Sequence, residues 1–146
     1  MEHFDQQMAA RVWQRVQENR PTVPFPDQIS GFLQEELQEL NLYRQLSFQL
    51  SGQKQQLLRL AEVTRRCIAV LRGILFLTDT KPEAAAFPNP KGLPAAALRR
   101  SYRNTLLRLD RYRQQQAHPE FSPGFIALTQ DTQERCRLLL EILGGL

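Results

Sequence analysis

Four long stretches of the chain carry apolar residues at spacings of three and four, the pattern of an amphipathic helix with one buried face. They span residues 26–50, 53–78, 93–116 and 123–143, and Pro and Gly cluster between them. No stretch alternates apolar and polar residues at period two, so no strand is predicted. In the third stretch the expected stripe consists of Leu98, Tyr102, Leu106, Leu109 and Tyr112. The pattern predicts an all-α fold, a four-helix bundle.

The connections between these helices restrict their order. The first pair and the last pair have short connections, so each pair is expected to form an antiparallel hairpin. The middle connection, 79–94, is much longer and rich in proline. About 14 extended residues reach about 45 Å, whereas a helix of about 24 residues is about 36 Å long. This connection can therefore cross the whole bundle, although a loose loop in an up-and-down bundle fits the spacing too.

A short helix is expected at about residues 5–18, with Met8, Val12, Trp13 and Val16 on its apolar edge. We therefore divide the chain into an N-terminal helix with its linker, 1–25, and the bundle, 26–146. The chain also repeats itself weakly at an offset of roughly 70 residues. Segment 36–45 is similar to 105–114, and 60–64 is similar to 128–132. Two copies of a helical hairpin fit the bundle.

Each helix places a polar side chain on its buried stripe at mid-length. Near the centre of the stripes lie Glu36, Thr64, Thr105 and Thr132, and at their flanks lie Cys67, Arg135 and Cys136. A helical Thr can satisfy itself by bonding its own i−4 carbonyl, and each Cys fits a small buried apolar residue. A buried carboxylate such as Glu36 needs either a partner or a raised pKa.

Three segments resemble the rubrerythrin branch of the ferritin-like superfamily. They are 32–36 leading to 43–47, 60–67 leading to 71–74, and 128–132 leading to 138–140. The resemblance covers nearly the whole chain after Pro26 and implies a ferritin-like bundle with a long crossover between its second and third helices. It also implies a di-iron site, with one Glu from each of two helices and Glu-x-x-His from each of the other two.

At the positions that correspond to those six ligands, only Glu36 remains. The replaced positions are Thr64, Cys67, Thr105, Thr132 and Arg135. Neither His3 nor His118 can substitute, because both lie outside the helix midsections. The resemblance therefore implies the fold but not the iron chemistry, and we expect no metal and no cofactor.

Arg135 stands where the resemblance implies a ligating His. Its guanidinium could turn inward and pair with Glu36, with Glu39 or Glu62 as further candidates, and the threonine hydroxyls could accept its remaining donors. A fixed cation would then take the place of the metal charge. Alternatively, Arg135 extends outward from the flank and Cys136 takes the core position.

The basic residues are 16 Arg and 3 Lys, and the net charge is +4. The arginines of 93–116, Arg108 among them, spread over the outer surface on a helical wheel. They are expected to form a solvated face, neutralised by Asp110 and by the acids of the last helix. Glu62 and Arg66 are expected to pair at i,i+4. Nucleic-acid binding favours a concentrated basic patch with stacking aromatics, which is not apparent.

Other function classes find little support. Two cysteines without a CxxC do not make a disulfide scaffold, no apolar run reaches the ~18 residues of a membrane span, and the N-terminus does not resemble a signal peptide. We expect a cytoplasmic protein that is a metal-free binding or structural module, and the resemblance admits a homodimer. The alternatives are a metal-dependent oxidoreductase built on Glu36, Glu39, Glu62 and Asp131, and an Arg-rich nucleic-acid-binding bundle.

Overall fold

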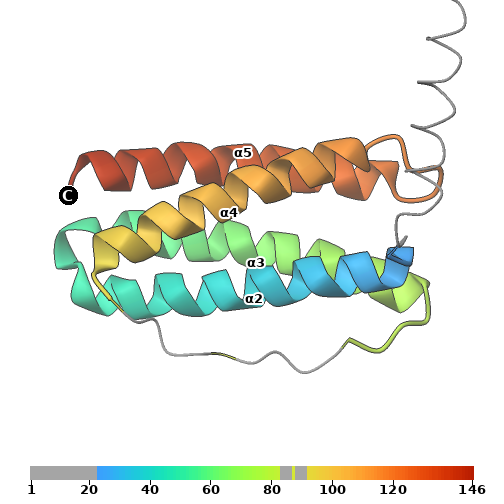
Figure 1. The fold of residues 1–146 in the computed structure, drawn as a ribbon, viewed down its shortest axis with the longest axis horizontal. Coiled ribbons are helices and arrows are strands. Elements are labelled where there is room, and N and C mark those ends of the chain that lie inside the picture. The colour runs from blue at the N-terminus through green and yellow to red at the C-terminus, as the bar shows by residue number, and fades with distance from the viewer. Residues whose placement is uncertain (1–22, 83–86, 88–91) are drawn as a thin grey trace, which may run out of the picture.

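The computed structural model describes residues 23–82, 87 and 92–146, and these form four long helices (Figure 1). The helices are α2 (Phe25–Gln49), α3 (Lys54–Leu77), α4 (Pro94–Gln114) and α5 (Ser122–Gly144), with a short 3₁₀ helix η1 (Ser51–Gln53) before α3. No strand occurs among these residues, so the all-α prediction is confirmed. The helix expected at 5–18 lies outside the described part of the chain.

Proline and a left-handed turn set the helix limits. Helices α2, α4 and α5 each have Pro in the first turn, where its fixed φ suits the helix and its missing N–H is not needed. Helix α3 ends in a Schellman motif, in which the N–H of Thr80 bonds to the carbonyl of Leu75 at 2.9 Å. Asp79 supplies the required positive φ of 53°.

Neighbouring helices in the bundle run antiparallel. Gln53, before α3, bonds to the carbonyl of Gly145, after α5, at 3.2 Å, and Gln28 in α2 bonds to Gln115, after α4, at 3.3 Å. Because α2 is antiparallel to both α3 and α4, helices α3 and α4 run in the same direction. Helix α3 therefore ends at one end of the bundle and α4 begins at the other (Figure 1). Most of the segment that joins them lies outside the described residues.

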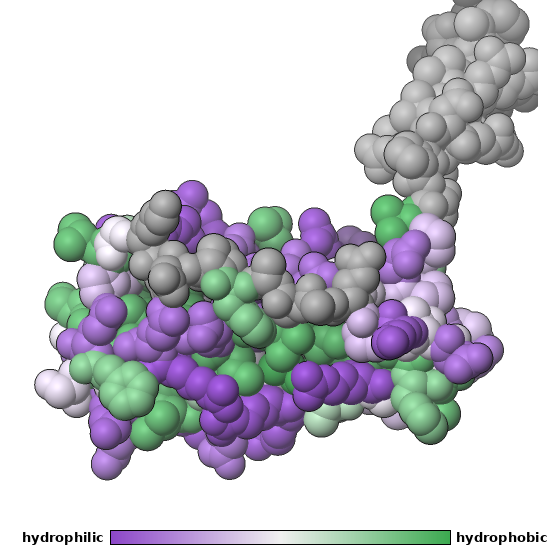
Figure 2. Space-filling view, turned by 90° about the horizontal axis from the view of Figure 1, so that it is seen from below, coloured by the Kyte–Doolittle hydropathy of each residue, from purple (hydrophilic) through white to green (hydrophobic). Residues whose placement is uncertain are grey.

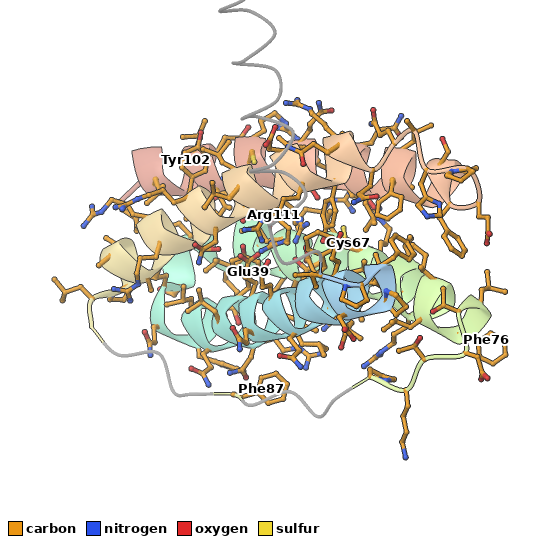
Figure 3. All side chains as sticks on the ribbon, turned by 45° about the vertical axis from the view of Figure 1, so that its right-hand side comes forward. Glu39, Cys67, Phe76, Phe87, Tyr102 and Arg111 are labelled. Carbon is orange, nitrogen blue, oxygen red and sulfur yellow. The ribbon has the colours of Figure 1, made fainter. Side chains whose placement is uncertain are left out.

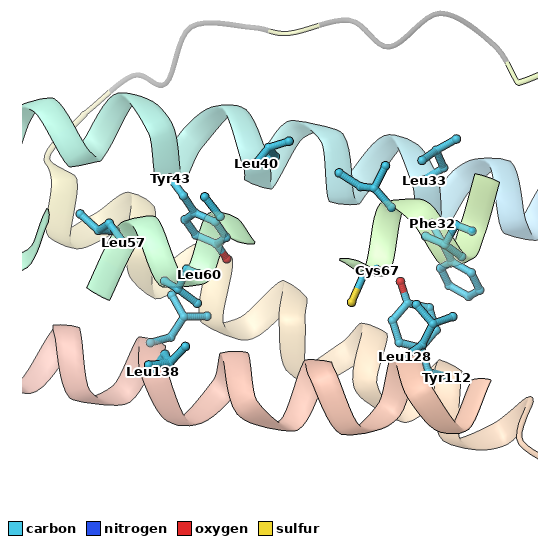
Figure 4. Packing of buried hydrophobic residues seen from close by; sticks show 14 of the residues in the cluster. Phe32, Leu33, Leu40, Tyr43, Leu57, Leu60, Cys67, Tyr112, Leu128 and Leu138 are labelled. Carbon is cyan, nitrogen blue, oxygen red and sulfur yellow. The ribbon is translucent and has the colours of Figure 1, made fainter. Parts of the chain in front are cut away.

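The core contains apolar side chains from all four helices and two inward-facing tyrosines. Tyr43 of α2 and Tyr112 of α4 are fully buried, and their hydroxyls point toward the middle of the bundle (Figure 4). The stripe expected on α4 is partly wrong, because Leu106 is 40% exposed while Ser101, which was not expected there, is buried. Thr105 is buried as expected. Compared with the predicted stripe, the buried face of α4 lies further round the helix, on the side of Ser101 and Arg108. In the described ranges, no helix has both the length and the apolar character needed to cross a membrane.

On the outer surface, the acids of α5 pair with α3. Arg66 binds Asp131 at 3.0 Å and Glu134 at 3.3 Å, and Arg59 binds Glu134 at 3.0 Å and Glu62 at 3.2 Å. The expected Glu62–Arg66 pair is therefore wrong, and so is the expectation that the acids of the last helix neutralise the arginines of α4. Helix α5 packs against both α3 and α4, and its acids Asp131 and Glu134 lie on the side that faces the arginines of α3.

Candidate functional site

Four charged side chains lie buried together at the middle of the bundle. Glu36, Glu39, Arg108 and Arg135 are 0%, 7%, 1% and 0% exposed, and we refer to them as the ion cluster. Glu39 is seen between the helices in Figure 3. Burying a charge costs several kcal/mol unless it is paired and hydrogen-bonded. The ion cluster meets this requirement, since its two carboxylates and two guanidinium groups sum to zero charge.

Glu36 is the centre of the ion cluster. Its carboxylate accepts hydrogen bonds from both terminal nitrogens of Arg135, including Nη2 at 2.9 Å. It also accepts from Nε of Arg108 at 2.6 Å and from the hydroxyl of Tyr112 at 2.9 Å. Burial by itself raises the pKa of Glu36, but the charges of Arg108 and Arg135 and these hydrogen bonds more than offset it and lower the pKa to about 2. Glu36 is therefore ionised inside the core.

Arg108 joins Glu36 to the second carboxylate. Its Nη1 and Nη2 bind the two oxygens of Glu39 at 3.1 and 2.5 Å, while its Nε binds Glu36. Tyr43 donates to Glu39 at 3.3 Å. Burial lowers the pKa of the Arg108 guanidinium, but the charges of Glu36 and Glu39 more than offset this, so the pKa lies well above its usual value. Arg108 is therefore charged in the core.

The threonines of this layer divide into two kinds. Thr132 accepts a hydrogen bond from Nη2 of Arg135 at 2.8 Å. Thr64 and Thr105 instead donate to the carbonyls four residues before them, at 2.7 and 2.6 Å. Thr64 also lies 3.5 Å from Nη1 of Arg135. At this level of the bundle, some threonines therefore bond to the carbonyl of their own helix, and Thr132 accepts a hydrogen bond from a guanidinium group.

The two cysteines show no sign of nucleophilic chemistry. Both are buried and free. Burial is the main cause that raises the pKa of Cys67 to about 12, with further contributions from Glu36 and Asp131. The pKa of Cys136 is raised by burial as well. A thiol with a raised pKa stays protonated and unreactive, which agrees with the expectation that each is a small buried apolar residue.

The structure shows the Arg135–Glu36 pair that the sequence predicts, with Glu39 beside it. The other candidate partner, Glu62, binds Arg59 at the surface instead. Arg108, expected on the outer face of α4, is the residue that sequence reasoning missed. Two signals could have found it. Arg108 lies three residues after Thr105 on the same helical face, and the internal repeat aligns it with Glu39.

The paired charges give the fold a specific dependence on pH. Glu36 has a pKa of about 2 in the folded protein against 4.5 for an ordinary glutamate. A lowered pKa contributes stability that is complete above pH 4.5 and is lost as the pH falls toward 2. This difference corresponds to about 3 kcal/mol. Urea unfolding measured from pH 6 to pH 2.5 should show this loss of stability. The double variant Glu36→Leu/Arg135→Met, which lacks both side chains of the pair, should not show it. Equal acid sensitivity in both proteins would contradict the assignment.

The ion cluster does not fit the di-iron centre that the resemblance implies. Iron is held by carboxylate and imidazole ligands that converge on one point, whereas Cys67 and Arg135 stand at the two histidine positions. Both buried carboxylates already accept bonds from guanidinium groups, whose fixed charge repels a cation. Within the described ranges, no three His, Cys, Asp or Glu side chains are grouped as a metal site would require. No family model, curated protein or solved structure matches this chain.

Proposed function

We propose that this chain is a metal-free protein of the ferritin-like type, in which an internal ion cluster takes the place of a di-iron centre. It acts as a binding or structural module and not as a redox enzyme. The observation that carries the proposal is the binding of Arg135 to Glu36 through both terminal nitrogens. The resemblance places a ligating His at position 135, so this guanidinium stands where a metal ligand would be.

The helix arrangement supports the ferritin-like part of the proposal. A bundle with two antiparallel hairpins and parallel second and third helices needs a crossover along its whole length, as the resemblance implies. Each helix also contributes two inward positions three residues apart at the same level. They are Glu36 and Glu39, Thr64 and Cys67, Thr105 and Arg108, and Thr132 and Arg135. This spacing is that of Glu-x-x-His, with other residues in place of the ligands.

The two alternative functions gain no support from the positions of their residues. An atypical metal site would need Glu62 or Asp131 beside the buried carboxylates, but these acids bind Arg59 and Arg66 on the surface. A nucleic-acid interface would need arginines available to phosphate groups. Arg108 is buried in the core, whereas Arg99, Arg103 and Arg113 of α4 are exposed, as they would be on any solvated helix face.

Metal analysis of the full chain tests the proposal. The protein is expressed with added iron and manganese, purified without chelator and analysed by inductively coupled plasma mass spectrometry. We expect both metals to be far below one per chain, and extended dialysis against a chelator to leave the urea unfolding curve unchanged. Iron or manganese at one or two per chain, with a loss of stability when the chelator removes it, would overturn the proposal.

A further inference from the structure

One edge of the Arg135 guanidinium group carries a hydrogen-bond donor that the protein itself does not satisfy. Arg135 is 0% exposed, and among the described residues its Nε–H is a buried side-chain donor with no hydrogen-bond partner. The two terminal nitrogens of the same group both bind Glu36. Buried N–H groups are nearly always paired with a protein atom or with an ordered water molecule, because an unpaired one loses its hydration without replacement. The Nε–H of Arg135 therefore indicates an acceptor that the protein does not supply.

Thr132 provides a second donor of the same kind. Its side chain is fully buried, and its hydroxyl oxygen accepts a hydrogen bond from Nη2 of Arg135 at 2.8 Å. The other buried threonines each donate to the carbonyl four residues earlier, at 2.7, 2.6 and 2.7 Å for Thr64, Thr105 and Thr129. Within the part of the chain that the structure describes, no acceptor binds the hydroxyl proton of Thr132. Thr132 thus differs from the threonines that satisfy themselves on their own helix.

The geometry of the guanidinium group brings these two donors together. Nε–H and one N–H of Nη2 lie on the same edge of its plane, and the other N–H of Nη2 lies on the edge that forks toward Glu36. The bond from Nη2 to Thr132 is therefore on the edge of Nε. An atom that accepts from Nε–H lies beside the Thr132 hydroxyl, within reach of its proton.

The surroundings of this edge are buried and made of short side chains. Thr64 and Cys67 of α3 lie at the same level as Thr132 and Arg135 of α5, and all four are 0% exposed. The sulfur of Cys67 points into the bundle (Figure 4). On the outside, hydrophilic and hydrophobic side chains lie next to one another over the helices on the face seen in Figure 2. The position therefore favours a ligand of the size of a single water molecule.

The charges next to this position favour a neutral ligand over an anion. The carboxylate of Glu36 already binds the neighbouring edge of the Arg135 guanidinium group. An anion at Nε would lie close to this carboxylate and be repelled by it. A water molecule carries no net charge and can accept a hydrogen bond from each of the two donors, and buried water typically binds two to four such polar groups.

We propose that one ordered water molecule binds between Nε of Arg135 and the hydroxyl of Thr132 and completes the ion cluster. It accepts one hydrogen bond from each of them. Together with the fork to Glu36, this bond fixes the orientation of the Arg135 guanidinium group. The inference rests on the hydrogen bonding of Arg135 and Thr132 and not on the proposed function, so a negative result for either leaves the other standing.

NMR detection of water contacts at the buried Nε–H groups of the full chain tests this proposal. In a ¹⁵N-resolved rotating-frame Overhauser experiment, we expect a direct water cross-peak at the Nε–H of Arg135. Arg108 is the matched control, because its Nε–H donates to Glu36 at 2.6 Å and should show no water contact. Arg137, whose side chain is 62% exposed, gives the signal of proton exchange, which has the opposite sign. No water contact at Arg135, or contacts of equal strength at Arg135 and Arg108, would overturn the proposal.

Thr132→Val distinguishes a bound water molecule from a signal relayed by an exchanging hydroxyl proton. The variant keeps the shape of the side chain without its hydroxyl, and Nη2 of Arg135 then becomes the second donor to the water. We expect the cross-peak at Arg135 to keep its intensity. If the cross-peak disappears in Thr132→Val, the hydroxyl proton was its source and no water is bound at Nε.

Discussion

Glu36→Gln is expected to lower the free energy of unfolding by about 3–5 kcal/mol, the usual cost of leaving a buried charge without its partner. The variant keeps the volume of the side chain but removes its charge. Arg108 and Arg135 then share the single remaining carboxylate of Glu39 in a buried site. The amide also cannot accept all the hydrogen bonds that Arg135, Arg108 and Tyr112 donate to Glu36. Urea unfolding at pH 7 measures the difference.

Glu62→Gln is the control for this variant. Glu62 carries the same charge, but its side chain is 62% exposed and it pairs with Arg59 on the surface. Such pairs contribute about 0–1 kcal/mol. If Glu36→Gln costs no more than Glu62→Gln, Glu36 does not hold two guanidinium groups in the core.

Removing Glu36 and Arg135 together is expected to cost less than the sum of the two single changes. Arg135→Met leaves Glu36 with only Arg108 as its cationic partner, and Glu36→Leu leaves two cations against Glu39. Each should cost about 3–5 kcal/mol. In Glu36→Leu/Arg135→Met the buried charge is balanced again, because Arg108 still binds both oxygens of Glu39. The coupling energy between the two sites should be about 2–3 kcal/mol.

Arg137 and Glu141 provide the control cycle. This pair on α5 has an N–O distance of 2.8 Å, but its side chains are 62% and 46% exposed. Its coupling energy should be only about 0.3–0.5 kcal/mol, the usual value for an exposed i,i+4 pair. Additive effects of the two single changes at Glu36 and Arg135 would contradict a charge-balanced interior.

Helix positions could be predicted from the sequence because spacing and proline are local signals. The predicted stretches agree with α2, α3, α4 and α5 to within a few residues at each end. The pairing of Arg135 with Glu36 was one of two possibilities that the sequence left open, the other being an Arg135 that extends outward. It followed from the helical wheel, from the need of a buried carboxylate for a cation, and from the resemblance, which implies a ligating His at position 135.

The position of Arg108 could not be predicted in the same way, because an arginine on a helix is ordinarily expected to face solvent. Its burial depends on two acids of another helix, Glu36 and Glu39, which lie about 70 residues earlier in the chain. The apolar stripe chosen for α4 also included Leu106, which rotated the predicted face away from Arg108. Contacts between helices, and not the pattern within one helix, decide this position.

The ionised state of Glu36 in the core is the central claim, and carbon-detected NMR of its side-chain carboxyl group tests it most directly. The full chain is labelled with ¹³C, the Glu36 signal is assigned through its backbone, and the spectrum is recorded at pH 4. A glutamate with the ordinary pKa of 4.5 is mostly protonated at this pH. We predict the chemical shift of a carboxylate for Glu36, because Arg108 and Arg135 hold its pKa at about 2. The shift of a protonated carboxyl group in the folded protein would contradict the account.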